Sequence, residues 1–342
     1  MKKIPIEEAI GESLCHDMTA ILAGGFKGVR FPRGHVIQAE DLEILRDMGK
    51  NHVFVWDPEQ DEIHEEDAAI ALLKGLKLAD TFEVKGPSEG KISLHAKQDG
   101  LFIANPTAMR EINQIEDWSI TSIAAKCPVR NGDLLAAWRI IPLVTQRKNI
   151  EAALEIAGKQ TLFELKPFKP KRVVILITGN EVYSGRIKDA FAPILTKKLA
   201  DFPSEIIAIH LLPDDLDRLS SHVEDALSSD LDLVLLTGGM SVDPDDLTPS
   251  IIRRYSDQVI CRGVPMQPGN MLTVAQAGKT VLMGVPAASM HARYTSLDVF
   301  LARFFADDLP DPEEIAEMGI GGLYSPNARE PWPVLSPKEL EQ

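Results

Sequence analysis

The feature that most constrains the fold is a series of short apolar runs after residue 172, in which apolar and polar residues do not alternate. The runs predict strands over 173–178, 205–212, 231–237, 270–275 and 280–285. The segments between and after them predict helices over 187–200, 215–228, 245–255 and 288–305. Such runs separated by helices are typical of a parallel sheet covered on both faces. We therefore predict that residues 172–309 form a three-layer, doubly wound α/β domain with a mostly parallel sheet.

The first half of the chain has another pattern, in which glycine and proline interrupt short segments. It predicts strands over 52–56, 91–94 and 134–141 and helices over 39–48 and 65–76. We expect a smaller α+β region, divided into an α+β unit at 1–80 and a β-rich unit at 81–165. A linker at 166–171 follows, because two prolines disfavour regular structure and the lysines keep the segment solvated. Residues 310–342 are expected to be a tail rich in proline and acids.

Charge and composition exclude several classes of protein. The 342 residues carry a formal net charge of −15, which excludes a general nucleic-acid surface. An anionic ligand can still bind where backbone amides, a few bases or a metal ion offset the repulsion. No apolar stretch approaches the ~18 residues of a membrane span, and the acids after Lys2 and Lys3 do not fit a signal peptide. We therefore expect a cytoplasmic protein without nucleic-acid or membrane partners.

The cysteines and histidines do not form a recognisable motif. Cys15, Cys127 and Cys261 are too far apart in sequence for a disulfide framework or a zinc motif. The Cys15-His16-Asp17 run does not predict a nucleophilic site, because consecutive residues of a strand point to opposite faces. We expect Cys261 to pack in the core.

Loops rich in Gly, Ser, Thr and acids follow the predicted strands of the α/β domain. The carboxyl ends of parallel strands meet at one edge of the sheet, and ligands bind outside that edge. Glycines let the backbone approach an anion, and Ser289 at a helix start adds a hydroxyl and the positive end of the helix dipole. The predicted ligand contacts are Thr178, Gly179, Ser184, Gly185, Thr237, Gly238, Gly239, Ser241, Pro286 and Ser289.

Three acids of the same loops, Glu181, Asp215 and Asp246, would repel a phosphate unless a cation bridges them. Mg²⁺ commonly uses one or two carboxylates together with ligand phosphates, so these three are predicted as magnesium ligands. Ordinary structural roles stay open for the same loops. Gly238-Gly239 can be a simple turn, and one of the acids Asp214 and Asp215 can be a helix N-cap.

These loops resemble those of the molybdopterin-binding domain, which is shared by molybdopterin molybdotransferases of the gephyrin E-domain type, molybdopterin adenylyltransferases and competence/damage-inducible proteins. The Thr-Gly-Asn-Glu-Val at 178–182 is similar to the Thr-Gly-Asp-Glu-Leu of the molybdotransferases. The Thr-Gly-Gly-Met-Ser-Val at 237–242 is similar to their Ser-Gly-Gly-Val-Ser-Val. Asp214-Asp215 falls where they have an acidic pair. The resemblance covers about residues 170–307.

The resemblance implies a domain that binds molybdopterin or its adenylate through the glycine loops. In the molybdotransferases, Mg²⁺ and molybdate meet adenylated molybdopterin, AMP leaves and the metal enters the dithiolene. The resemblance therefore implies that Glu181, Asp215 and Asp246 serve in catalysis as well as in metal binding. It also implies a homo-oligomer and a molybdoenzyme that accepts the cofactor.

Two loops depart from the family pattern. The Lys-Pro-Gly-Lys-Pro of the family is here the Gln-Pro-Gly-Asn-Met of residues 267–271, so both lysines are missing. The Gly-Leu-Pro-Gly-Asn-Pro-Val-Ser segment has lost its second glycine and second proline at 284–291. Bases nearby, such as Arg186 and Arg293, are expected on helix surfaces. A non-catalytic carrier or sensor of the molybdenum cofactor therefore stays open, as does a metal-dependent nucleotide pyrophosphatase.

Overall fold

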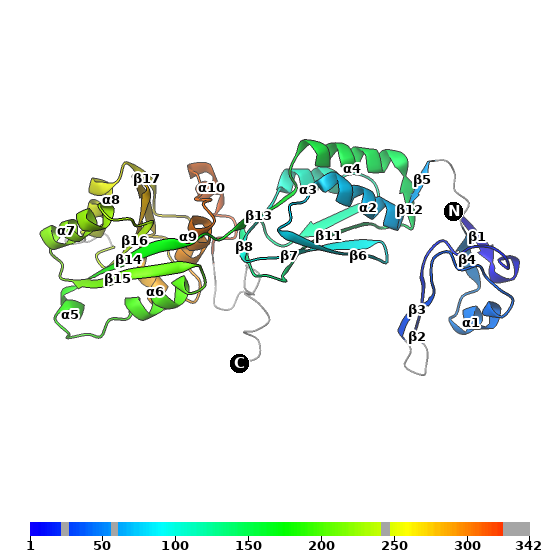
Figure 1. Cartoon of the computed structure of the whole chain (residues 1–342), viewed down its shortest axis with the longest axis horizontal. Helices are drawn as coiled ribbons and strands as arrows, with labels where there is room; N and C mark the ends of the chain where they lie inside the picture. Colours follow the sequence, from blue (N-terminus) through cyan, green and yellow to red (C-terminus); the bar gives the residue numbers. More distant parts are fainter. Residues whose placement is uncertain (22–26, 56–60, 241–246, 324–342) are drawn as a thin grey trace. The chain divides into compact units, whose positions relative to one another are not determined.

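The structure is a computed structural model, and it describes residues 1–21, 27–55, 61–240 and 247–323 (Figure 1). The chain divides into two units. Unit 1 contains residues 1–97, 103–125 and 131–164. Unit 2 contains residues 98–102, 126–130 and the chain from 165 onward.

The N-terminal part of unit 1 has two small antiparallel pairs of strands. β1 (Lys2–Pro5) pairs with β4 (His52–Val55), and β2 (Met18–Ile21) pairs with β3 (Lys27–Phe31). The helical elements are η1 (Ile6–Glu8) and α1 (Asp41–Asp47). A small core that includes Ile37 and Leu45, both fully buried, holds this part together.

The rest of unit 1 is built on an antiparallel sheet in the order β6-β7-β11-β9. Its strands are β6 (Phe82–Ser88), β7 (Lys91–Ala96), β9 (Trp118–Ser122) and β11 (Leu134–Ile140). The helices are α2 (Glu65–Leu76), α3 (Pro106–Asn113) and α4 (Arg147–Lys159), and β5 (Glu62–His64) pairs with β12 (Val144–Gln146). Buried Trp138 of β11 donates a hydrogen bond to the Ala69 carbonyl of α2 at 3.1 Å, which ties the sheet to that helix.

The chain passes between the two units through three short strands in the order β10-β8-β13. They are β8 (Gly100–Ala104), β10 (Cys127–Val129) and β13 (Phe163–Pro167). The predicted linker at 166–171 is therefore only partly irregular, because 166 and 167 end β13 and Lys171 begins the next strand.

Unit 2 contains a six-stranded sheet in the order β15-β14-β16-β19-β18-β17. The parallel strands are β14 (Lys171–Thr178), β15 (Ser204–Leu212), β16 (Leu233–Thr237) and β19 (Thr280–Gly284). The strands β17 (Gln258–Arg262) and β18 (Thr273–Ala277) are antiparallel. Only Gly278 and Lys279 join β18 to β19, whereas a parallel neighbour needs a crossover of about a dozen residues. The predicted, mostly parallel α/β sheet is confirmed.

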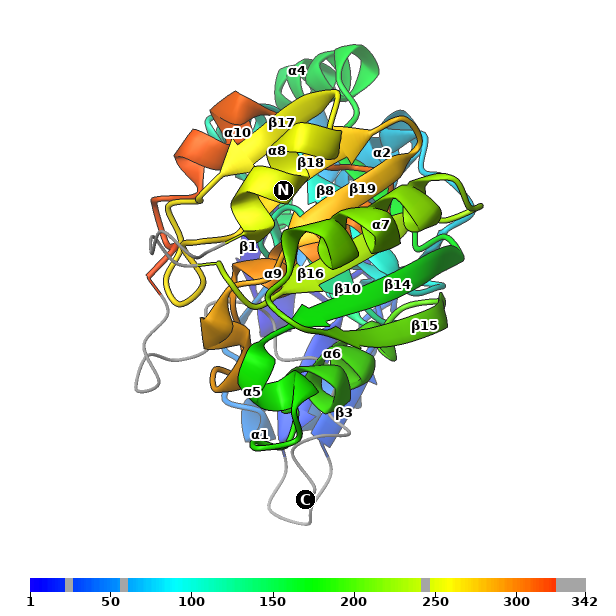
Figure 2. The ribbon, with the colours of Figure 1, turned by 90° about the vertical axis from the view of Figure 1, so that its left-hand side faces the viewer.

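Helices cover both faces of this sheet, so the domain has three layers. One core contains residues of α6 (Phe191–Leu199), α9 (Ser296–Phe305) and α10 (Pro312–Glu317). The core on the other face contains residues of α7 (Leu216–Leu227) and α8 (Thr248–Tyr255), which lie on the near side in Figure 2. The central strand β16 is buried along its whole length, which explains its uninterrupted apolar sequence.

Two helix predictions in this unit need correction. The helix expected at 288–305 is split into η2 (Ala287–Met290) and α9, because Thr295 and Asp298 form a capping box that starts a new helix. The helix expected at 187–200 begins at Phe191, where the Asp189 carboxylate accepts backbone hydrogen bonds from Phe191 and Ala192 at 2.9 Å. A short helix, α5 (Asn180–Tyr183), precedes it.

The predicted tail at 310–342 is in part folded. α10 lies within it, and its Ile315 belongs to the core. Residues 324–342 lie outside the described part of the chain.

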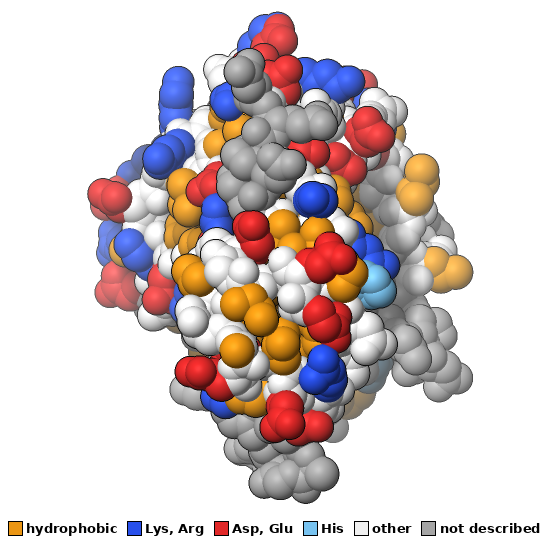
Figure 3. All heavy atoms as spheres, turned by 90° about the vertical axis from the view of Figure 1, so that its right-hand side faces the viewer, with side chains coloured by type: hydrophobic (Ala, Val, Ile, Leu, Met, Phe, Trp, Pro, Cys, Tyr) orange, Lys and Arg blue, Asp and Glu red, His pale blue; other side chains and the backbone are white. Residues whose placement is uncertain are grey.

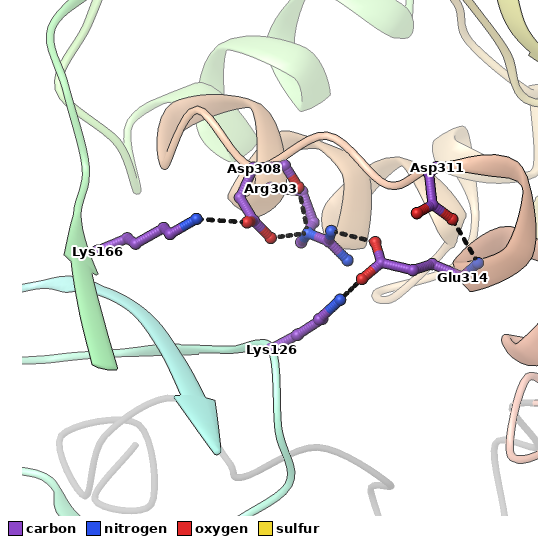
Figure 4. Close-up of polar contacts among 6 residues, drawn as sticks. All are labelled: Lys126, Lys166, Arg303, Asp308, Asp311 and Glu314. Carbon is purple, nitrogen blue, oxygen red and sulfur yellow. Dashed lines mark hydrogen bonds and ion pairs between the residues drawn. The ribbon is translucent and has the colours of Figure 1, made fainter. Parts of the chain in front are cut away.

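An ion cluster holds α9 and α10 to the strands that enter unit 2 (Figure 4). The Arg303 side chain is only 3% exposed, and it pairs with Asp308 and Glu314 at 2.7 Å each. Lys166 pairs with the same Asp308 at 2.7 Å, and Lys126 pairs with the same Glu314. Segments from three parts of the sequence therefore meet at one buried arginine.

The surface agrees with the acidic composition. On the face shown in Figure 3, Lys and Arg side chains are interspersed with Asp and Glu and do not form one basic field. Among the described residues, no helix is both long and apolar enough to span a membrane.

Candidate functional site

The carboxyl ends of four strands form the edge at which the sequence predicted a site. β15, β14, β16 and β19 are parallel neighbours, so the loops that follow them begin at the same edge. We call this edge the rim. The loop after β15 is acidic, and those after β14, β16 and β19 begin with or follow a glycine at the strand end, which is the usual position of a ligand site in this fold.

An open hollow of about 650 Å³ lies between the loops after β14 and β15. Three of the residues predicted as site residues, Glu181, Ser184 and Asp215, line it. The remaining lining residues are Asn180, Tyr183, Arg186, Pro213, Asp214 and Arg218. Asn180 and Asp214, which are 34 positions apart in sequence, therefore share one hollow.

The two loops are joined by a reciprocal pair of hydrogen bonds. The Asp214 carboxylate accepts from the Asn180 backbone N–H at 2.9 Å, and the Asn180 side-chain oxygen accepts from the Asp214 backbone N–H at 3.2 Å. Asp215 caps α7 by accepting from the Arg218 backbone N–H at 2.8 Å. The capping role considered for one acid of the pair is thus confirmed for Asp215. Both acids have structural roles, and Asp215 also presents its carboxylate to the hollow.

Two arginines bring positive charge to the hollow. Arg218 donates a hydrogen bond to the Tyr183 hydroxyl at 3.0 Å, and its guanidinium lies 5.9 Å from the centre of that ring. Arg186 follows α5 and lines the same hollow. Sequence reasoning assigned Arg186 to a helix surface and did not consider Arg218. The available signal was the position of Arg218 in the first turn of the helix that Asp215 caps, because that turn faces the rim.

The glycine loop after β16 packs closely against the loop after β14. Gly238 has φ +87°, and a Cβ atom on it would lie 2.2 Å from the Thr178 carbonyl oxygen. The Thr178 hydroxyl donates to the Thr237 carbonyl at 3.2 Å, and the Thr248 hydroxyl donates to the Gly238 carbonyl at 2.7 Å. Close packing therefore requires this glycine whether or not a ligand is bound. Among the described residues, the fully buried Thr237 hydroxyl has no hydrogen-bond partner.

The other predicted contacts are spread along the rim. Gly179 precedes α5, Gly185 follows it with φ +73°, and Gly239 has φ +49°. Pro286 is buried, and Ser289 is 1% exposed with its hydroxyl 3.2 Å from that of Thr295. Ser289 lines a separate cavity of unit 2 rather than the hollow beside Glu181. Ser241 and Asp246 lie outside the described residues.

The predicted magnesium site is only partly described. Within residues 1–21, 27–55, 61–240 and 247–323, no three His, Cys, Asp or Glu side chains are placed to hold a metal ion. Glu181 and Asp215 nevertheless supply two carboxylates to one hollow. This donor set fits an ion that takes its remaining ligands from phosphate and water, as Mg²⁺ does, and does not fit an all-protein metal cage.

The fold and the rim define the class of this domain, a doubly wound α/β domain with a polar hollow at the strand ends. Residues 174–305 match a family model described as a probable molybdopterin binding domain. Residues 3–57 match a second model, described as a domain of unknown function (DUF8806).

Curated relatives match parts of the chain. A molybdopterin molybdenumtransferase of Staphylococcus aureus is 28% identical over 156 residues, which are 44% of this chain and 37% of the relative. A CinA-like protein of Thermosipho melanesiensis is 38% identical over 84 residues, 25% of this chain and 21% of the relative. The matches thus span 37% and 21% of the length of these two relatives.

Solved structures overlap with the chain at low similarity. The molybdopterin biosynthesis enzyme MoaB of Thermus thermophilus is 24% identical, with a TM-score of 0.35 over 41% of this chain and 98% of that protein. A molybdopterin biosynthesis MoeA protein of Pyrococcus horikoshii is 13% identical, with a TM-score of 0.34 over 90% of this chain and 75% of that protein.

Proposed function

We propose that this protein acts in molybdenum cofactor biosynthesis by binding molybdopterin or its adenylate at the rim of unit 2. The observation that carries the proposal is the hollow in which Glu181 and Asp215 lie together with Arg186 and Arg218, within the segment that matches the molybdopterin-binding family. A phosphorylated ligand needs positive charge in a chain of net charge −15, and two arginines and a bound cation can supply it.

The residues of the hollow would have distinct roles toward a phosphate group. The guanidinium of Arg218 is oriented by the Tyr183 hydroxyl and would hold phosphate oxygens with charge-assisted hydrogen bonds. Glu181 and Asp215 would hold Mg²⁺, with Asp246 as the predicted third acid. When bound, Mg²⁺ neutralises phosphate charge and polarises the bond to be cleaved. The backbone N–H groups of the glycine loops would complete the contacts with the anion.

We further propose that the chain is a molybdotransferase, which takes molybdate as its substrate and releases AMP from adenylated molybdopterin. The experiment mixes the purified chain with adenylated molybdopterin, Mg²⁺ and molybdate, and follows AMP release and cofactor formation. Asp215→Asn is the sharpest variant, because asparagine keeps the N-cap acceptor of α7 and removes only the charge. We expect AMP release to fall by about 100-fold or more, since a metal contributes several kcal/mol to such a step.

Asp217→Asn is the matched control. It removes the same charge from the exposed first turn of the same helix, and Asp217 does not line the hollow. Equal loss in Asp217→Asn and Asp215→Asn would show that general charge, and not the site, is responsible. Absence of molybdopterin binding would overturn the proposal as a whole.

A second candidate is a non-catalytic carrier or sensor of the cofactor, and one specific observation favours it. The 267–271 loop has neutral Gln267 and Asn270 where the molybdotransferases have lysines, so it offers no side-chain cation to a developing negative charge. In this structure the loop is held to a later segment of the chain, because the Gln267 backbone N–H donates to the Gly322 carbonyl at 2.7 Å. Tight binding of molybdopterin without AMP release would support this candidate. AMP release from unrelated dinucleotides would support a pyrophosphatase.

A further inference from the structure

Two histidines from different elements of unit 2 lie side by side. His210 belongs to β15 and His222 to α7, and the centres of their rings are 5.0 Å apart. His210 is the register partner of Leu176 on β14, and Leu176 belongs to the core that α7 covers. Register partners point to the same face of a sheet, so His210 faces the helix that carries His222.

The two rings are accessible to an ion from solvent. β15 is the last strand at one end of the six-stranded sheet, and both histidines are half-buried. On α7, His222 lies next to buried Val223 and one turn after buried Leu219, so it is at the margin of the face that packs on the sheet. The pair therefore lies where the contact between the strand and the helix opens to water.

The hydrogen bond of His222 determines which of its nitrogens can bind a metal. Its Nδ1 lies 2.9 Å from the Arg218 backbone carbonyl, one turn earlier in the same helix. A carbonyl oxygen only accepts, so Nδ1 carries the proton, and Nε2 of the neutral ring keeps its lone pair. Histidines that bind metals commonly donate their other ring N–H to a carbonyl or carboxylate in this way, which fixes the orientation of the ring.

His210 is also held in the form that binds metals. Burial, together with the neighbouring His222, lowers the pKa of His210. Its ring therefore stays neutral at neutral pH, and a neutral imidazole is the form that coordinates a metal ion.

The spacing of the rings suits one shared ion. With metal–nitrogen distances of about 2.0–2.1 Å, two imidazoles bound to one tetrahedral ion have ring centres about 5 Å apart. The observed separation is 5.0 Å. Edge-to-face aromatic contacts also occur at this distance, so the spacing gains its meaning from the hydrogen bond that orients His222.

We propose that His210 and His222 bind one divalent transition-metal ion of the class of Zn²⁺, Ni²⁺ and Cu²⁺. Imidazole suits these ions, whereas Mg²⁺ prefers oxygen ligands. Water would complete the coordination, since no group of three His, Cys, Asp or Glu is placed for a metal in the described part of the chain. Neither histidine lines the rim hollow, so this site is independent of the magnesium and molybdopterin site proposed there.

Calorimetric titration of the full chain with Zn²⁺ tests the proposal. We expect one ion to bind per chain in the tightest step, and a hundredfold excess of Mg²⁺ to change its affinity less than twofold. His210→Gln and His222→Gln should each weaken this step at least tenfold. Unchanged affinity in either variant, or displacement of Zn²⁺ by Mg²⁺, would overturn the proposal and leave an ordinary ring contact.

Two control variants locate the ion. His95 of β7 makes the same kind of bond, from Nδ1 to the Gly132 carbonyl at 3.2 Å, so His95→Gln removes an equivalent imidazole outside the pair and should leave the affinity unchanged. Asp215→Asn removes a carboxylate of the rim and should also leave it unchanged. A tenfold loss in either control would refute a site at the pair.

Electron paramagnetic resonance of the unsubstituted chain gives a test that does not depend on how the variants fold. With less than one Cu²⁺ per chain, we expect coupling to two imidazole nitrogens, and coupling to one in His210→Gln or His222→Gln. Circular dichroism would show that both variants retain the fold. Coupling to one nitrogen or none in the unsubstituted chain would overturn the proposal.

Discussion

A buried arginine of unit 2 and four partly buried groups of unit 1 are accommodated in different ways. In unit 2 the arginine at the centre of the ion cluster, Arg303, is 3% exposed and contacts two carboxylates. In unit 1 two histidines, a thiol and a carboxyl group shift toward their neutral forms as they lose water. Burial lowers the pKa of His16 and His64, and it raises the pKa of the Cys15 thiol to about 11. Burial also raises the pKa of Glu65, which Arg139 offsets only in part.

The difference follows from the chemistry of the side chains. An arginine stays charged at any ordinary pH, so it can be buried only with charged partners. A histidine or a thiol can give up or keep its proton and become neutral when it loses water. The Arg303 cluster should therefore be sensitive to the loss of a partner, and the buried histidines of unit 1 should be sensitive to pH.

The largest effect is expected for Arg303→Met, which keeps much of the side-chain volume and leaves Asp308 and Glu314 partly buried without their main partner. We expect the free energy of unfolding of unit 2 to fall by about 3–5 kcal/mol. Hydrogen exchange of peptides from β14 and β16 measures it. Lys169→Met is the control, because the Lys169–Asp307 pair is 57% and 43% exposed and should contribute far less. Similar losses in both variants would contradict the central role of Arg303.

A smaller effect is expected in unit 1 for Arg139→Met. The Glu65 side chain is 7% exposed and pairs with Arg139, itself 34% exposed, at 2.8 Å. Removal of the partner should cost about 1–3 kcal/mol, because a partly buried carboxylate is left alone. The buried residues Trp118 and Trp138 both belong to unit 1, so their fluorescence during urea unfolding reports on it.

The double variant Arg139→Met with Glu65→Gln distinguishes the cost of the unpaired Glu65 carboxylate from the cost of lost packing around Arg139. It removes the stranded charge as well, so it should recover most of the lost stability. If the double variant is as unstable as Arg139→Met, the cost lies in packing and not in the unpaired carboxylate.

The effect of pH on the stability of unit 1 should be smaller than the effect of Arg139→Met. Because His16 and His64 have pKa values below the ordinary 6.5, the unfolded chain takes up protons first as the pH falls. The free energy of unfolding of unit 1 is therefore not reduced by these two histidines well above pH 6.5, and it falls progressively as the pH drops below that value. His64→Asn keeps a side-chain acceptor at the N-cap of α2 and removes the titration. Urea midpoints at pH 7.5 and 5.5 should differ less in this variant, and an unchanged difference would exclude His64 as a source.

The smallest effect is expected for Lys159→Ala on α4. Its ion pair with Glu155 is 69% and 66% exposed, and water screens it almost completely. The urea midpoint of unit 1 should not change measurably. A clear loss would mean that exposed pairs matter here, which would weaken the contrast between buried and exposed charge.

Much of the fold could be predicted because its signals are local. Helix α2 lies at residues 65–76, as predicted, and β14 and β16 follow the apolar runs. The split of the helix expected at 288–305 was missed, because the apolar spacing continues across a capping box whose bonds the spacing does not reveal. At the rim, Glu181, Ser184 and Asp215 line one hollow, and their role as site residues stays a prediction; the arginines beside them were not assigned to it.

The sequence by itself determined that the strands are parallel and that polar loops follow them at one edge of the sheet. This was possible because the apolar pattern that identifies a strand is a property of neighbouring residues. Only the tertiary structure decided which of those residues share a hollow. Ser289, which was predicted to contact the ligand at the rim, lines another cavity together with residues of α6 and β10. The physical reason is that convergence of side chains depends on how whole elements pack, and packing joins residues that no local pattern relates.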